Sequence, residues 1–152
     1  MQDLSGVLIQ PVTHDIRRIT DPNLIKPLMD VQAAIYDQNF DDMTERLTWE
    51  LTNYPDYLSL YGAYIEDVPV ASARMYFPAN SQFASMWGGG TLASYRGRGV
   101  YTALVAARVQ EAIQRGRRFL TIDASPMSRP IVEKLGFIPI STSTPCNWQM
   151  PS

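Results

Sequence analysis

Two glycines separated by one residue, with arginines beside them, form the stretch of this sequence best suited to bind a phosphate. The stretch reads Arg96-Gly97-Arg98-Gly99, and apolar residues at helical spacing begin directly after it at Val100. Glycine lets backbone N–H groups approach a ligand, and a helix N-terminus offers unpaired N–H groups and a positive dipole end. The arginines add positive charge to the same turn. The turn is therefore a candidate site for a phosphorylated cofactor; the alternative is an ordinary basic turn.

Three consecutive glycines, Gly88 to Gly90, lie just upstream in a stretch that reads as a strand from Phe83 to Leu92. Glycine weakens a strand interior, so three in a row indicate a bulge or a close backbone approach to a ligand. The alternative is a flexible kink. Because the Arg96 turn follows at once, the sequence favours a role in binding.

A second motif lies downstream. Phe119 to Ser125 reads as a short buried strand, and Pro126 to Lys134 reads as a helix that stops at Gly136. The Gly/Arg turn together with the ending Lys134-Leu135-Gly136-Phe137 resembles the GCN5-related N-acetyltransferase (GNAT) superfamily. In that family the turn reads Gln/Arg-x-x-Gly-x-Gly/Ala, and here Tyr101 replaces the final small residue. The resemblance covers roughly residues 60–150 well, and the first third only in general layout.

The resemblance implies that the chain binds acetyl-CoA. In the family, amides of the turn bind the pyrophosphate, and the preceding strand end pairs with the pantetheine arm. The positions expected to contact the cofactor are Thr91, Leu92, Ala93, Arg96, Gly97, Arg98, Gly99, Val100, Tyr101, Thr102 and Ser125.

The family also builds one wall of its acceptor site from the first two helices. This implies that Tyr36, Phe40 and Trp49 line a substrate pocket. The alternative is that aromatic residues at helical spacing simply pack in the core.

Acyl transfer to an amine needs a polarised thioester carbonyl, a neutral amine, close positioning and a departing thiolate. The family often has a general-acid tyrosine three residues before the leucine of Leu-Gly-Phe, and here that residue is Val132. No carboxylate lies between Asp67 and Glu111 to act as a strand-borne base. We therefore expect Ser128, one helical turn before Val132, to assist the leaving sulfur. The alternative is that Ser128 caps the helix or packs against the cofactor.

The elements that position these residues follow from the rest of the chain. Asp21-Pro22 predicts the start of a helix that runs to about Tyr36, and a second helix is expected over Asp41–Thr52. Leu58–Ile65 and Val70–Phe77 read as a hairpin with its turn at residues 66–69. Further strands are expected at Gly6–Val12, Phe137–Ile140 and Asn147–Met150.

Charge is distributed unevenly along the chain. Residues 1–67 hold twelve acidic and four basic side chains, whereas residues 68–152 hold three acidic and nine basic ones. A basic half suits a phosphorylated cofactor, and an acidic half suits a cationic amine; the alternative is two solvated faces without a partner. The basic residues are too dispersed to indicate a nucleic-acid partner. No apolar run approaches the length of a membrane span, and we expect no metal site.

The sequence therefore predicts a single domain over residues 1–152, of α/β (α+β) class. The resemblance implies that its sheet is mixed and mostly antiparallel, with a splayed strand pair at the cofactor site and helices on both faces. The predicted activity is transfer of an acetyl group from acetyl-CoA to a primary amine on a small molecule or peptide. Alternatives are a non-catalytic acyl-CoA-binding regulatory module of the same fold and, more weakly, a nucleotide-binding module. One cysteine excludes an internal disulfide, which favours a cytoplasmic location. We expect a monomer or a homodimer.

Overall fold

The computed structural model describes residues 11–150. Within them, five strands form one sheet in the order β1-β2-β3-β4-β5. Their bounds are Asp15–Ile19 for β1, Leu58–Ile65 for β2, Val68–Tyr76 for β3, Phe83–Thr91 for β4 and Phe119–Ile122 for β5. Neighbours from β1 to β4 run antiparallel, and β4 pairs with β5 in parallel, so the predicted mixed, mostly antiparallel sheet is confirmed.

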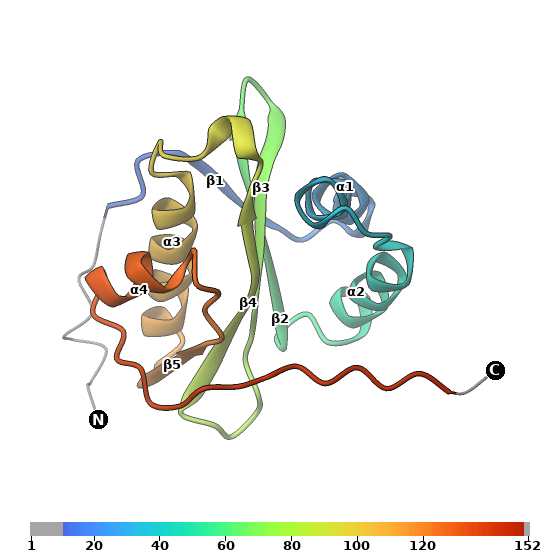
Figure 1. The fold of residues 1–152 in the computed structure, drawn as a ribbon. Coiled ribbons are helices and arrows are strands. Elements are labelled where there is room, and N and C mark those ends of the chain that lie inside the picture. The colour runs from blue at the N-terminus through green and yellow to red at the C-terminus, as the bar shows by residue number, and fades with distance from the viewer. Residues whose placement is uncertain (1–10, 151–152) are drawn as a thin grey trace.

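Helices cover both faces of this sheet, as predicted (Figure 1). α1 (Ile25–Tyr36) and α2 (Asp41–Asn53) lie on one face, and α3 (Val100–Gln114) and α4 (Arg129–Lys134) lie on the other. Buried apolar side chains fill the space between each helix pair and the sheet. No helix in residues 11–150 is long and apolar enough to cross a bilayer.

The first helical segment begins where the sequence predicts. The Asp21 carboxylate accepts a hydrogen bond from the Asn23 backbone N–H at 2.9 Å, and Pro22 opens a 3-10 turn, η2 (Pro22–Leu24), that runs into α1. Apolar residues at helical spacing, such as Leu28 and Val31, are buried against the sheet. This packing brings the end of α1, at Tyr36, beside the end of β4.

The hairpin turn is tighter than predicted. Only Glu66 and Asp67 form it, with φ of 50° and 62°, and Val68 and Pro69 already belong to β3. Two adjacent left-handed residues are what a two-residue hairpin turn requires. Pro69 is tolerated in the strand because the pairing of β3 with β4 begins only at Ala71, so that edge needs no N–H there.

β4 contains the irregularity that its glycines predict. The pairing with β3 passes from Ser72–Gly90 to Arg74–Trp87, which inserts one extra residue into β4, and Gly88 has φ of 57°. On its other edge, β4 pairs with β5 only from Phe83 to Met86, although β4 continues to Thr91. β5 ends at Ile122, opposite Met86, so the stretch of β4 from Trp87 to Thr91 has no strand beside it on that edge. The predicted splay of a strand pair stays a prediction.

One predicted element cannot be compared, and three others differ in the structure. Most of the predicted strand Gly6–Val12, residues 6–10, lies outside the described part, and the first described strand is β1. α4 begins at Arg129 rather than Pro126, because residues 126–128 form a turn. The predicted strands Phe137–Ile140 and Asn147–Met150 are wrong: this exposed segment pairs with no strand (Figure 1), and apolar spacing alone does not make one.

Candidate functional site

A cavity of about 570 Å³ opens between the start of α3, the end of β4, the end of α1 and the turn before α4. The cavity lies where β4 continues past the end of β5, because no neighbouring strand covers that edge of β4 there. The predicted site residues that line it are Tyr36, Thr91, Arg96, Gly97, Gly99, Val100, Tyr101, Thr102, Ser125 and Ser128. Ile35, Gly89, Gly90, Tyr95, Met127 and Ile131 complete the lining.

The start of α3 forms one end of the cavity. Gly99 is its N-cap residue with φ of 79°, a conformation that favours glycine, and no side chain caps the helix. The first backbone N–H groups of α3 are therefore left for an external acceptor. Arg96 lines the same end, where its Nε donates to the Thr91 carbonyl at 3.1 Å and ties the turn to β4.

The only histidine lies unexpectedly close to this turn. A Cβ placed on Gly99 would be 3.4 Å from Cε1 of His14, which immediately precedes β1. This contact could not be predicted from the sequence, because 85 positions separate the two residues and nothing local in the N-terminal stretch indicates it. A side chain larger than glycine at position 99 would therefore meet His14 as well as the cavity.

Three of the predicted cofactor residues do not line the cavity. Leu92 and Ala93 lie at the turn into the 3-10 helix η3 (Ala93–Tyr95), and Arg98 points its guanidinium over the Tyr95 ring at 5.4 Å. Their backbone groups remain next to residues that do line it. Their role in binding stays a prediction.

The end of β4 forms the floor of the cavity, and two glycines keep it open. A Cβ on Gly90 would lie 3.0 Å from Cδ1 of Ile35 in α1, and one on Gly89 would lie 3.0 Å from Cε2 of Tyr101 in α3. Thr91 follows them, and its hydroxyl is buried without a hydrogen-bond partner in the described residues. An unpaired buried hydroxyl beside a cavity is suited to a polar ligand group.

A smaller chamber of about 80 Å³ continues from the cavity and shares five of its lining residues. The shared residues are Tyr36, Gly89, Tyr101, Ser125 and Ser128. The chamber adds Asp123, which follows β5, and Arg108 of α3. Both escaped the sequence interpretation: a single arginine within a helix is ordinarily a surface residue, and Asp123 belongs to no motif.

Arg108 is unusual because it is fully buried. Its Nε donates to the Leu104 carbonyl at 3.1 Å and its Nη1 donates to the Arg74 carbonyl at 3.4 Å, while Nη2 has no hydrogen-bond partner in the described residues. Burial lowers the pKa of Arg108 to about 10, and the nearby Tyr101 and Tyr61 side chains oppose that decrease. The group stays protonated at neutral pH, so it is a buried cation.

Ser128 and Ser125 lie together at the wall between the cavity and the chamber. The two hydroxyls are 3.1 Å apart, and the Ser125 hydroxyl accepts the Ser128 backbone N–H at 3.2 Å. Val132, one turn later, is 2% exposed and packs in the protein interior. The position where the family often has an acid is therefore occupied by a core residue.

The three predicted acceptor residues have different surroundings. Tyr36 lines both the cavity and the chamber. Phe40 packs near Tyr36, with ring centroids 6.2 Å apart, and against the core below α1 and α2. Trp49 is 57% exposed and contacts Tyr54 instead, because on α2 it lies opposite the buried Leu47 and Leu51. In residues 11–150, no cluster of His, Cys, Asp or Glu is arranged to hold a metal ion.

Comparison with known proteins points to the same family by sequence and by structure. The sequence profile of the acetyltransferase (GNAT) family matches residues 25–137, which is most of the chain. No curated protein matches the chain.

Several solved structures share the fold. One is the aminoglycoside acetyltransferase AAC(6')-Iy in complex with the bisubstrate analogue CoA-S-monomethyl-acetylneamine: TM-score 0.71, 23% identity, covering 90% of this chain and 98% of that one. Another is a predicted acetyltransferase from Clostridium acetobutylicum with acetyl-CoA: TM-score 0.70, 21% identity, covering 89% and 96%. A third is an aminoglycoside acetyltransferase from an uncultured soil metagenomic sample, with sisomicin: TM-score 0.74, 13% identity, covering 90% and 96%.

Proposed function

Because the chain belongs to the acetyltransferase (GNAT) family, we propose that it transfers an acetyl group from acetyl-CoA to a primary amine. One observation carries the proposal. A single cavity joins the uncapped N-terminus of α3 to the bulge of β4, so it can hold a phosphate at one end and a thioester at the other. Positioning alone supplies much of the acceleration in such a reaction.

The donor would lie along this cavity. The N–H groups of Val100, Tyr101 and Thr102 would bind the pyrophosphate, with Arg96 adding positive charge. The uncovered edge of β4 beyond Met86 would pair with the amides of the pantetheine arm. The unpaired Thr91 hydroxyl fits this arrangement, because it would gain a polar partner there.

The acceptor would enter from the side of α1. Tyr36 lines the cavity there, and the segment that follows carries Asp37, Asp41 and Asp42 within a strongly acidic half of the chain. A cluster of acidic side chains attracts polycationic amines. Two of the structural neighbours were solved with aminoglycoside ligands, which are molecules with several amino groups. Polyamines and aminoglycosides are therefore the first acceptors to test.

The deciding experiment measures release of free CoA thiol from acetyl-CoA with a panel of amines. Aminoglycosides, linear polyamines, free amino acids and short peptides form the panel. The proposal predicts amine-dependent CoA release with at least one member and an acetylated product of the expected mass.

The second candidate is a non-catalytic acyl-CoA-binding module, which the core position of Val132 favours because no acid occupies that place. Tight acetyl-CoA binding without turnover of any amine would support this module. Failure to bind acetyl-CoA at all would contradict both candidates.

A further inference from the structure

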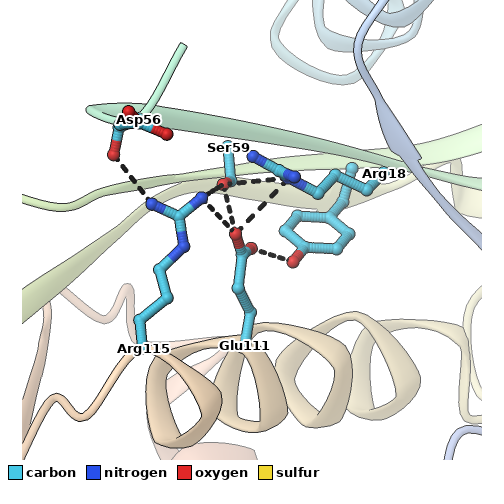
Figure 2. A network of polar contacts seen from close by, with 6 residues as sticks. Arg18, Asp56, Ser59, Glu111 and Arg115 are labelled. Carbon is cyan, nitrogen blue, oxygen red and sulfur yellow. Dashed lines mark hydrogen bonds and ion pairs between the residues drawn. The ribbon is translucent and has the colours of Figure 1, made fainter.

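Within residues 11–150, the buried Arg108 forms no ion pair with a carboxylate. Glu111 lies one turn further along α3, but its carboxylate is occupied elsewhere (Figure 2). It accepts hydrogen bonds from the Tyr61 hydroxyl and, at 2.7 Å, from the Ser59 hydroxyl, and it forms an ion pair with Arg115 at 2.7 Å. Arg18 adds a further ion pair at 3.4 Å. This carboxylate therefore faces β1 and β2 and already has two cationic partners.

The other carboxylate near Arg108 is Asp123, across the chamber. It is exposed and accepts a hydrogen bond from the Ser143 hydroxyl at 2.8 Å. Water screens an exposed charge far more than a buried one. The electrostatic potential inside the chamber is therefore set mainly by the buried guanidinium of Arg108.

The guanidinium lies directly beneath the bulge. A Cβ on Gly89 would be 3.3 Å from Nη2 of Arg108, and Nη1 bonds the carbonyl of Arg74 on the neighbouring strand. On the opposite side of the sheet, Nη1 of Arg74 would meet a Cβ on Gly88 at 2.5 Å, and Nε of Arg74 is buried without a partner in the described residues. Two guanidinium groups thus bracket Gly88 and Gly89, each with an unpartnered nitrogen.

We infer that Arg108 is a positioning residue for acyl transfer: it holds the β4 bulge and favours negative charge in the chamber, so that the CoA sulfur leaves as a thiolate without a tyrosine acid. This inference rests on the proposed function. Arg108 acts through its contact with the bulge and through the electric field of its charge, because its side chain is fully buried and has no exposed surface to touch a ligand.

The reaction that it would assist is balanced as follows. The amine nitrogen forms a bond to the acyl carbon while the C–S bond breaks and its electron pair passes to sulfur. The amine loses one proton to solvent, and the products are the amide and the CoA thiolate. Negative charge develops first on the acyl oxygen and then on sulfur, and a preorganised cation nearby stabilises both.

The test measures the pKa of the thiol of bound CoA. A Cys146→Ser background removes the only protein thiol, and the thiolate absorbance is followed against pH with the desulfo-CoA complex as the blank. The blank cancels the titration of groups around the chamber, which are Tyr36, Tyr61, Tyr101, Arg74, Asp123 and Arg108 itself. A unit charge at several ångströms in a partly buried site predicts a thiol pKa at least about 1 unit below that of free CoA.

Variants separate the charge from the packing. Arg108→Met should return the thiol pKa toward that of free CoA and lower kcat about tenfold with little change in the KM for acetyl-CoA. Arg108→Lys should recover part of both effects. The matched control is Arg117→Met, which removes a half-buried arginine that bonds Ser81 at the far end of β4 and should leave the thiol pKa unchanged.

The outcomes are distinguishable. Bound CoA with an unshifted thiol pKa in the unmutated chamber would overturn the inference while leaving the proposed function intact, and that result needs no variant to fold. An equal shift in Arg108→Met and in Arg117→Met would overturn it too. If CoA does not bind, both the proposed function and the inference fail.

Discussion

Ser128 is the residue on which the predicted leaving-group chemistry depends. Its hydroxyl lines both the cavity and the chamber and lies 3.4 Å from the Ser125 carbonyl, to which it donates. The requirement for an acid is limited. If the CoA thiol resembles cysteine, with a pKa of about 8.5, releasing it as thiolate at pH 7 costs roughly 2 kcal/mol.

Ser128→Ala should therefore lower kcat about tenfold with little change in the KM for acetyl-CoA, which is the pattern of an interaction made in the transition state. Steady-state kinetics provides the measurement. Ser128→Thr, which keeps a hydroxyl, is the matched control and should retain most of the rate. A raised KM alone would assign Ser128 to binding, and no change in either constant would remove it from the mechanism.

Among the elements, the β4 bulge contains a glycine whose backbone conformation and close neighbour both oppose a side chain. Gly88 has φ of 57°, and a Cβ there would lie 2.5 Å from Nη1 of Arg74. Gly88→Ala should destabilise the fold by more than the roughly 1–2 kcal/mol of left-handed strain, because Arg74 must also move. Denaturant unfolding measures the loss.

Gly116→Ala is the control for that variant, because Gly116 has φ of 68° with nothing within 4 Å of a Cβ. It should show the strain alone. Equal losses for the two variants would mean that Arg74 does not pack against the bulge.

The polar cluster of Figure 2 joins α3 to β1 and β2 and gives a second prediction at this scale. Glu111→Ala leaves Tyr61, Ser59, Arg18 and Arg115 without their shared acceptor. Removing one partner from a buried ionic network costs about 3–5 kcal/mol, and thermal or denaturant unfolding should show a loss of that size. Tyr61→Phe, which deletes one donor, should cost less. If Glu111→Ala costs under about 1 kcal/mol, the cluster is not a major link.

How well the elements could be predicted depended on whether their signals are local. The Asp21 cap, the apolar stripe of α1 and the glycines of β4 act within a few residues, and the structure confirms the elements that they predict. A strand, by contrast, needs a partner that apolar spacing cannot identify. This is why residues 137–150 were wrongly predicted to contain strands.

At the scale of the whole molecule, the cavity joins elements that are distant in the sequence. The Arg96–Gly99 turn could be predicted as a phosphate site because its residues are contiguous, and that role stays a prediction. Arg108 and His14 were not recognisable, because their significance comes from contacts with Gly89 and Gly99 across the fold. Tertiary packing places Arg108 and His14 beside these glycines, and no local sequence pattern indicates it.

The acidic first half of the chain and the absence of an obvious base lead to a pH prediction. A lysine-like amine has a pKa of about 10.4, so only about one molecule in 2,500 is neutral at pH 7. Since only the neutral amine attacks, the rate at subsaturating amine should rise from about pH 6 to pH 9. A flat profile, with the chemical step shown to be rate-limiting, would contradict this class of acceptor.

The most direct test of the central claim is titration calorimetry with acetyl-CoA on Gly99→Glu. A carboxylate at the uncapped start of α3 would oppose the pyrophosphate, and the affinity should fall by at least about 2 kcal/mol, or roughly thirtyfold. Gly116→Glu imposes similar backbone strain in open space beyond the end of α3 and should bind acetyl-CoA normally. Unchanged affinity for acetyl-CoA in a folded Gly99→Glu protein would contradict the claim that the start of α3 binds the pyrophosphate.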